Sequence, residues 1–457
     1  MKKLYFAVML LCIAFTLNAQ TLNYNDIGVL FSKENINGTA RYNAMSGAFG
    51  ALGGDLSSIE TNPAGAAVFL KSEFSISLNS RNVKTASSFY GTNELIDNDY
   101  TNVSQAGGVF VFNTRNNSDW SNLAIGFNYS MANDFENLWI AEGNSGFAPI
   151  TDFYDPVIQN DASTPVYGNS DGQYFEDYTE GRNNKYSFTI ASQYNDNLYL
   201  GFSLNTYDIE YYQSTLIKEY NNDGTGNNFD VSQTQELLTV GDGYSFNFGL
   251  ISKPNDNIRL GLAFQSPVWY TLSEEYVEYD VSIFDNNINI TNDYPTGDTF
   301  SGVNGYDYKL RTPSKLTGSF AYIFNNQGLI SLDYVYKNYS NIKLSNANFT
   351  EENKTFKTDM ESTGQLRIGT EWRFNAISLR GGYHIEKSPY KNALDIEDIE
   401  GFSFGAGFKF KGGKLDFSYQ KSSNSTSYNV YGPDSNVNAT DLDIDNSKIT
   451  ATLVLNI

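Results

Sequence analysis

The sequence predicts an all-β protein, a 14-stranded antiparallel transmembrane β-barrel with a small N-terminal helical hatch inside the lumen. Three observations lead to this fold class. Large apolar residues recur at every second position in many segments, short and long connections alternate between these segments, and the chain begins like an export signal. A period of two gives each strand one apolar face. Alternating short and long connections are typical of outer-membrane barrels.

The composition narrows the class further. The 457 residues contain 52 acidic and 30 basic side chains, a net charge of −22, and a single cysteine, Cys12. This excess of negative charge excludes a nucleic-acid partner, because nothing would neutralise a row of phosphates. One cysteine excludes a disulfide scaffold. The 33 Tyr and 32 Phe argue against disorder, since disordered chains are poor in aromatic residues.

Residues 1–19 are a predicted signal peptide. Lys2 and Lys3 precede an apolar run, and the small residue Ala19 stands at the expected cleavage site. Lipidation at Cys12 is disfavoured because no small residue precedes it. Cleavage removes Cys12 and leaves an exported chain without thiols. No later run approaches the ~18 apolar residues of a membrane-spanning helix, so we expect strands to cross the cell outer membrane.

The predicted barrel comprises residues 72–457, and its connections set the topology. Fourteen strands place both chain ends on the periplasmic side. A soluble two-sheet protein is the alternative, but it gives no reason for connections that alternate in length. The expected short periplasmic turns are 194–197, 252–257, 325–328, 375–376 and 411–413. The expected long extracellular loops are 82–104, 132–184, 213–242, 267–309, 341–364, 387–399 and 426–446.

Aromatic residues cluster at the expected periplasmic ends of the outward faces. Rings at this depth form the interfacial girdle of a barrel, although aromatic residues also favour strands in general. The expected girdle residues are Tyr322, Phe324, Trp372, Phe374, Phe408, Phe410 and Phe417.

Residues 20–71 form the predicted N-terminal hatch, because no period-two alternation appears there. Asn62 and Pro63 suit the N-cap and first position of a short helix that ends near Ala67. Several large apolar residues need apolar surroundings, which favours a plug inside the barrel over a loose periplasmic extension. Small residues that would allow close packing recur at Ala44, Gly47, Ala48, Ala51 and Gly54.

The run of small residues at 47–55, followed by Asn62-Pro63-Ala64, resembles the hatch of the FadL-type outer-membrane transporters of hydrophobic compounds. The resemblance covers the whole chain in architecture and residues 41–70 in detail. It implies a 14-stranded barrel, a hatch with an Asn-Pro-Ala motif, and release of apolar ligands sideways where the third strand kinks. Ile457 departs from the aromatic residue common at barrel C-termini. The chain also resembles Bacteroidota-type members, some of which serve as accessory subunits of outer-membrane machines.

The predicted function is uptake of a hydrophobic small molecule, a long-chain fatty acid or an aromatic hydrocarbon, by binding and lateral release without catalysis. Outer-membrane lipid would receive the ligand. The alternative is a barrel that does not transport but docks with protein partners in a secretion or assembly complex. On the inward face of the expected strand 121–131, Gly126 is the candidate weak point. The candidate ligand-binding residues are Phe31, Met45, Phe49, Phe69 and Gly126.

Other chemistry is sparse in the sequence. His384 is the single histidine. We expect it to be a polar residue that faces the lumen; the alternative is an axial ligand of haem. No phosphate-binding loop, zinc spacing or dinucleotide fingerprint appears. One loop spaces its oxygen-bearing side chains like a calcium-binding loop, although such loops are also common surface features. Its candidate calcium ligands are Glu219, Asn221, Asp223 and Asp230.

Overall fold

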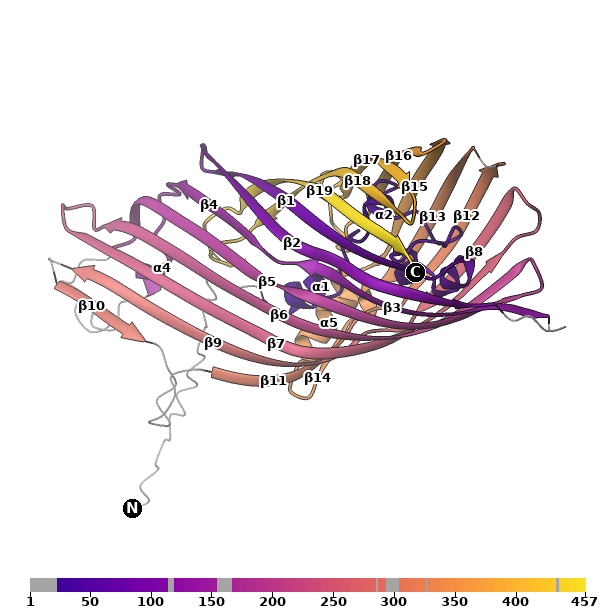
Figure 1. The fold of residues 1–457 in the computed structure, drawn as a ribbon. Helices are drawn as coiled ribbons and strands as arrows, with labels where there is room; N and C mark the ends of the chain where they lie inside the picture. Colours follow the sequence, from indigo (N-terminus) through magenta and orange to yellow (C-terminus); the bar gives the residue numbers. More distant parts are fainter. Residues whose placement is uncertain are drawn as a thin grey trace, which may run out of the picture.

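The strands form one closed antiparallel barrel (Figure 1). The computed structural model describes residues 23–113, 119–153, 167–284, 287–292, 304–325, 327–432 and 435–457, and the predicted signal peptide lies outside them. Closure follows from the ladder between β1 and β19, which runs from the pair Glu73 and Asn456 to the pair Ser88 and Asp441. The predicted fold class is confirmed.

Within the described ranges, the segments labelled β1 to β19 make up fourteen strands of the barrel wall, because some strands are interrupted and carry two labels. Ten are continuous: β1 (Glu73–Phe89), β2 (Thr92–Phe112), β5 (Asn169–Tyr194), β6 (Leu198–Asn222), β7 (Asn228–Ser252), β15 (Ser362–Phe374), β16 (Ile377–Glu386), β17 (Ile399–Phe410), β18 (Gly413–Tyr428) and β19 (Thr440–Asn456). Four are interrupted: β3 (Trp120–Asp134) with β4 (Asn137–Gly143), β8 (Ile258–Gln265) with β9 (Trp269–Phe284), β11 (Asn304–Arg311) with β12 (Lys315–Phe324), and β13 (Gly328–Asn338) with β14 (Lys343–Ser345). β10 (Asn287–Asn292) extends the tip of β9.

The period-two alternation of the sequence places apolar side chains on the outside of the wall. All seven expected girdle residues are exposed, and the rings of Phe324 and Trp372 stack with centroids 5.5 Å apart beside a short turn. This outward apolar belt matches a surface that faces lipid. Typical belt residues are Phe127, Phe188, Ile190, Phe202, Phe248, Leu262, Leu332, Phe404 and Leu453.

The short turns lie where the sequence predicts them, but most of the expected long loops are strands. The expected loop 82–104 is a hairpin of β1 and β2 that turns at Tyr90 and Gly91. The expected loop 213–242 is likewise the pair β6 and β7, which turns between Asn222 and Asn228. Above the belt the outward face has polar residues, so the hydrophobic alternation fades while the backbone ladder continues. Parts of 132–184 and 267–309 lie outside the described residues.

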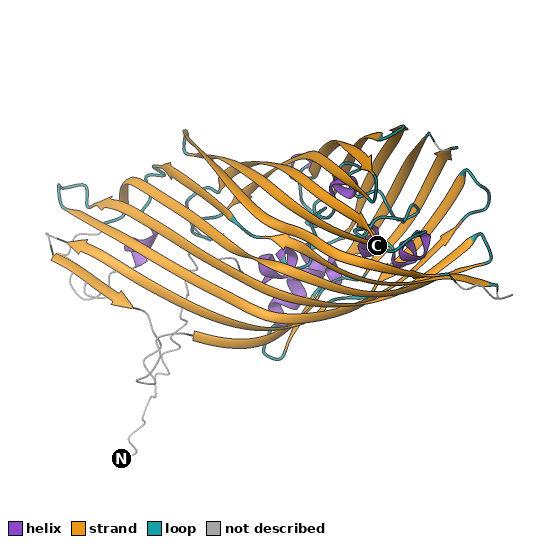
Figure 2. Cartoon of the chain, in the orientation of Figure 1, coloured by secondary structure: helices purple, strands orange, loops and turns teal. Residues whose placement is uncertain are grey.

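Of the segment before β1, the described residues 23–72 lie inside the barrel (Figure 2). Its helices are α1 (Tyr24–Leu30), α2 (Ala40–Asn43), α3 (Ser58–Thr61) and the 3-10 helix η1 (Pro63–Val68). Four further short helices lie between strands: α4 (Pro149–Phe153), η2 (Tyr339–Asn341), α5 (Thr350–Asp359) and η3 (Asp395–Glu397). Within the described ranges, none of the helices is long and apolar enough to cross a membrane.

Inward-facing glycines let the hatch backbone touch the wall. A Cβ atom at Gly201 would overlap Pro63, and one at Gly249 would overlap the side-chain oxygen of Asn62. Cβ atoms at Gly382 and Gly369 would lie 2.5 and 2.7 Å from main-chain atoms of Met45. These distances are shorter than any normal contact, so only glycine fits at these wall positions.

The orientation of the barrel can be tested at the two ends of β6. The sequence predicts that the turn 195–197 is periplasmic and the tip 223–227 extracellular, so we expect an impermeant maleimide to label Thr225→Cys on whole cells and to leave Asp196→Cys unlabelled. Both positions are exposed, and residues 20–457 contain no competing cysteine. The reverse labelling pattern would contradict this orientation.

The glycine contacts predict that Gly249→Ala loosens the hatch. Overpacking of this kind costs about 1–3 kcal/mol, and the hatch can yield more easily than the hydrogen-bonded wall. Limited proteolysis should therefore cut the N-terminal segment faster, while the heat-modifiable gel mobility of the barrel is kept. Gly318→Ala is the matched control, because nothing lies within 4 Å of its Cβ position. Equal cutting of both variants would show that the close approach is unimportant.

Candidate functional site

The wall has a break between its second and third strands. β2 pairs with β3 only from Phe112 and Leu123 to Gln105 and Ser130. Beyond Gln105, β2 continues to Thr92 and pairs with β1 alone. Bulges flank the break, because the β1–β2 register slips after Ser77 and the β3–β5 register slips after Met131. Bulges commonly end pairing and turn a strand away from its neighbour.

At the break, β3 exchanges β2 for the hatch as its hydrogen-bond partner. The backbone N–H of Asn35 donates to the carbonyl oxygen of Ala132 at 2.9 Å. The side chain of Asn37 donates to the carbonyl oxygen of Met131 at 2.9 Å, and that of Asn133 donates to the carbonyl oxygen of Lys33 at 2.7 Å. The hatch therefore bonds to the part of β3 where the backbone ladder with β2 is missing, while β5 continues to pair with β3 on the other side.

A small polar cavity of about 40 Å³ lies behind the break, between β3 and the hatch. This volume has room for only a few water molecules, so the cavity is too small for a larger ligand in this structure. Residues of β3 and of the hatch line one side, and charged residues from β5, β12 and β15 line the other. The lining includes Asn35, Asn37, Ser130, Met131, Lys185 and Arg367.

The cavity carries more positive than negative charge. Lys185 pairs with Glu60 of the hatch at 2.7 Å, and Lys315 pairs with Glu34 at 2.5 Å. Arg367 is 8% exposed and donates only to neutral oxygens, those of Gln365 and Tyr42. In the part of the chain that the structure describes, it is in no ion pair. Arg367 lies opposite the buried carboxyl of Asp333 on β13, which accepts from the backbone N–H of Gly50 in the hatch. Because three cationic and two anionic side chains line the cavity, it favours an anion.

An apolar aromatic cluster lies next to the break. Phe135 follows β3 directly, and its ring centroid lies 5.7 Å from that of Phe31 and 5.2 Å from that of Tyr211. These residues belong to a larger buried cluster between α1, α5 and the inner wall. A cationic cavity beside an apolar cluster suits a ligand with an acidic head and an apolar tail.

The Asn-Pro-Ala motif forms the predicted cap and also anchors the hatch. The side-chain oxygen of Asn62 accepts from the N–H of Ala64 at 3.1 Å, with Pro63 at the first helical position. The side-chain amide of Asn62 donates to the carbonyl oxygen of Gly50 at 2.7 Å and to that of Leu250 on β7 at 3.1 Å. The last bond ties the hatch to the wall.

The structure does not gather the expected ligand-binding residues in one pocket. Met45 and Phe49 pack together near the inner ends of β12 and β13, whereas Phe69 packs in a separate cluster and Phe31 lies near the break. All four are almost fully buried. The four residues belong to three different contacts of hatch and wall, because the hatch meets the barrel on several sides.

The position expected for the weak point needs correction. Gly126 does face inward, towards Ile59 of the hatch, 3.3 Å from its Cβ position. However, it pairs with Val109 on one side and Thr189 on the other, so the ladder is intact there. The break begins later in β3, after Ser130, because strand pairing depends on bulges that the position of one glycine does not reveal.

The structure does not assemble the expected calcium site either. Glu219 and Asn221 face the barrel interior, where they bond to each other at 2.9 Å. Asp230 lies opposite Tyr220, on the outward face of the same hairpin. Asp223 closes the tip by accepting from Thr225 and Asn227, and these bonds lower the pKa of its carboxyl. The described ranges contain no group of three or more His, Cys, Asp or Glu residues that could hold a metal.

Sequence reasoning missed the charged residues of the cavity. His384, which it singled out, is buried on the inner wall 3.4 Å from the side-chain oxygen of Ser46. Lys185, Lys315 and Arg367 occupy inward positions on strands with apolar outward faces. Charged residues at membrane depth usually mark a function, so this rule could have found them.

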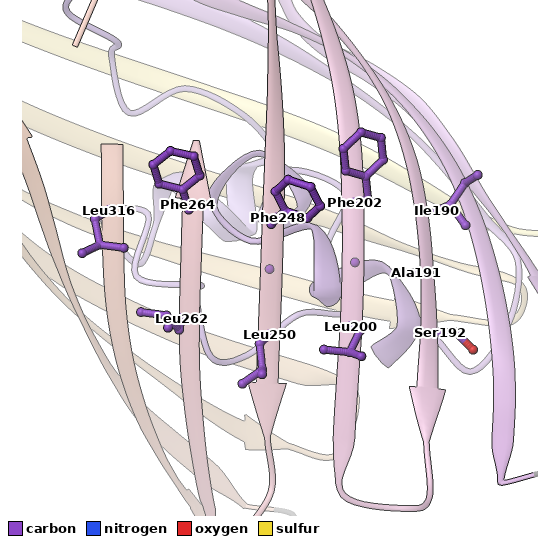
Figure 3. A pocket seen from close by; sticks show the side chains of 12 residues that line it. Ile190, Ala191, Ser192, Leu200, Phe202, Phe248, Leu250, Leu262, Phe264 and Leu316 are labelled. Carbon is purple, nitrogen blue, oxygen red and sulfur yellow. The ribbon is translucent and has the colours of Figure 1, made fainter. Parts of the chain in front are cut away.

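The outer wall also has a shallow apolar groove behind the Asn-Pro-Ala motif (Figure 3). A row of phenylalanines, including Phe202 and Phe248, lies above a row of leucines, including Leu200 and Leu250. Gly201 and Gly249 form its floor. The groove belongs to the lipid-facing belt and is separate from the cavity.

A closed barrel with an outward apolar belt and a filled lumen defines an outer-membrane protein. The family described as outer membrane protein transport protein (OMPP1/FadL/TodX) matches residues 160–447, more than half of the chain. The chain therefore belongs to this family, whose members are outer-membrane transport proteins of hydrophobic compounds.

Solved structures share the fold at low sequence identity. A Pseudomonas aeruginosa FadL homologue is 14% identical, with a TM-score of 0.59 over 93% of this chain and 99% of its own. The toluene transporter TodX of P. putida is 12% identical, with a TM-score of 0.55 over 92% and 99%. The toluene transporter TbuX of Ralstonia pickettii is 14% identical, with a TM-score of 0.54 over 92% and 99%. Comparison with curated proteins gives no significant match.

The two roles of Asn62 can be separated. Asn62→Ala loses the cap, worth about 0.5–2 kcal/mol, and both anchoring bonds, whereas Asn62→Asp keeps the cap acceptor and loses only the donors. We expect hydrogen exchange across 50–68 to rise in both variants, and more in Asn62→Ala, with barrel mobility on a gel unchanged. Loss of the folded barrel would show that the segment is part of the structural core.

Proposed function

We propose that the protein takes up a hydrophobic small molecule across the outer membrane, binds it behind the break, and releases it sideways into the bilayer. The observation that carries this proposal is the break itself, where β3 leaves β2 and is held by the hatch. The hatch fills the lumen, which favours a sideways route over an axial one.

A lateral route has a physical advantage for an apolar solute. Each CH₂ group exposed to water costs about 0.8 kcal/mol, so release into an aqueous periplasm would be unfavourable. The break begins just above Phe127, a residue of the apolar belt. A ligand leaving there enters the outer edge of the hydrocarbon region and avoids water.

The cavity favours long-chain fatty acids over neutral aromatic hydrocarbons. A carboxylate could accept directly from Arg367, whose present hydrogen-bond acceptors are neutral, and the tail could follow the apolar cluster at Phe31 and Phe135. Because the cavity holds only about 40 Å³, binding requires the hatch or β3 to move.

A second candidate is a docking role in a membrane complex. Leu95, Leu394 and Ile396 are 63%, 64% and 62% exposed on the hairpins outside the apolar belt. Such exposed aliphatic residues suit contact with a protein partner.

Uptake measurements test the first function. Cells that lack the protein should take up a labelled long-chain fatty acid more slowly. Arg367→Gln should reduce fatty-acid uptake and spare an aromatic hydrocarbon, because a hydrogen bond to a charged group is worth about 1.5–3 kcal/mol, or at least about tenfold in affinity.

Arg373→Gln is the matched control, since Arg373 lies on the same strand but pairs with Glu371 at the other end of the barrel. Equal loss in both variants would contradict a specific role of Arg367. Normal uptake of every compound in cells without the protein, together with co-purification of a large membrane complex, would favour the docking role.

A further inference from the structure

Side chains bridge the break where the backbone ladder is missing. A guanidinium nitrogen of Arg81 on β1 donates to Asp134 at the end of β3 at 2.8 Å, and the same nitrogen donates to the carbonyl oxygen of Glu136 at 2.6 Å. The side chain of Asn102 on β2 donates to the other carboxylate oxygen of Asp134 at 3.0 Å. Asp134 therefore connects β3 to both strands of the neighbouring hairpin.

The bridge is shielded from solvent. The side chains of Arg81 and Asp134 are 11% and 7% exposed, and Arg81 lies over the ring of Tyr100, 5.1 Å from its centroid. Further along, β4 is held to the same hairpin by side chains alone, because Ser87 donates to the carbonyl oxygen of Ile140 and Asn98 to that of Leu138.

Two neighbouring residues thus hold β3 to different parts of the molecule. Asn133 bonds to the hatch through Lys33, whereas Asp134 bonds to the wall through Arg81 and Asn102. If the Asp134 bonds separate, β3 stays attached to the hatch and the wall opens along β2. If they persist, the break remains closed to any molecule larger than the cavity.

We propose that Asp134 is the latch of the lateral opening: its bonds to Arg81 and Asn102 close the wall, and their separation lets an apolar ligand leave between β2 and β3. This inference rests on the proposed function for the direction of transport. It adds the residue that controls opening. Asp134 acts on the wall and not on the ligand, so it is a positioning residue.

A reversible crosslink tests the latch. We expect a cleavable bifunctional thiol reagent to stop fatty-acid uptake in Asn102→Cys/Asp134→Cys, and a reducing agent to restore it. The control pair Asn82→Cys/Asp99→Cys joins opposed positions of β1 and β2, which the backbone ladder already holds together. Its crosslinking should leave uptake unchanged. Undiminished uptake in the crosslinked test pair would overturn the proposal.

A second measurement does not depend on transport. Met131 is 3% exposed beside the break, so Met131→Cys should react slowly with a soluble thiol reagent. Asp134→Asn should raise this rate severalfold, and exchanging the charges with Arg81→Asp and Asp134→Arg should bring it back. Heat-modifiable mobility verifies that each barrel is folded. An unchanged labelling rate in Asp134→Asn would overturn the latch. A different outcome would overturn the proposed function and not the latch: wild-type cells take up no fatty acid, while Asp134→Asn still raises the labelling rate of Met131→Cys.

Discussion

Direct contact between the hatch backbone and the barrel wall is the constraint on which the rest of the structure depends. Inward glycines such as Gly201, Gly249 and Gly382 remove the side chains that would keep the two apart. The hatch can then exchange hydrogen bonds with wall strands, as Asn62 does with Leu250. A lumen filled this closely favours movement through the wall over movement along the axis. The break between β2 and β3 is the part of the wall that such a route would use.

The break is stable because other groups satisfy the backbone that it leaves unpaired. Buried polar groups of the main chain need partners, and the hatch supplies them to Met131 and Ala132. Side chains of β1 supply them to Glu136 and Ile140, and Asn98 of β2 supplies one to Leu138. Side-chain bonds are fewer than ladder bonds and can separate one at a time. The same chemistry that keeps the wall intact therefore also makes this part of it the easiest to open.

The sequence was sufficient to predict the strands, their number, the short turns and the cap at Asn62, because each depends on local patterns. It was not sufficient for the long hairpins, such as the one that turns at Gly91, since ladder bonds there continue without an apolar face. The position of the break depends on register slips at Ser77 and Met131, which no local pattern reveals. The sequence also did not reveal that the candidate ligand-binding residues lie apart, because Phe49 and Phe69 contact different sides of the wall.

The order of the chain gives the hatch contacts a consequence for biogenesis. The hatch precedes β1 in sequence, yet the wall encloses it without clearance at Gly201 and Gly249. A folded hatch could not slide into a finished cylinder of this kind. Hatch folding and the pairing of β1 with β19 therefore belong to one assembly event, in which the wall strands close around the hatch. A hatch supplied as a separate peptide would meet a closed wall and could not complement a truncated chain.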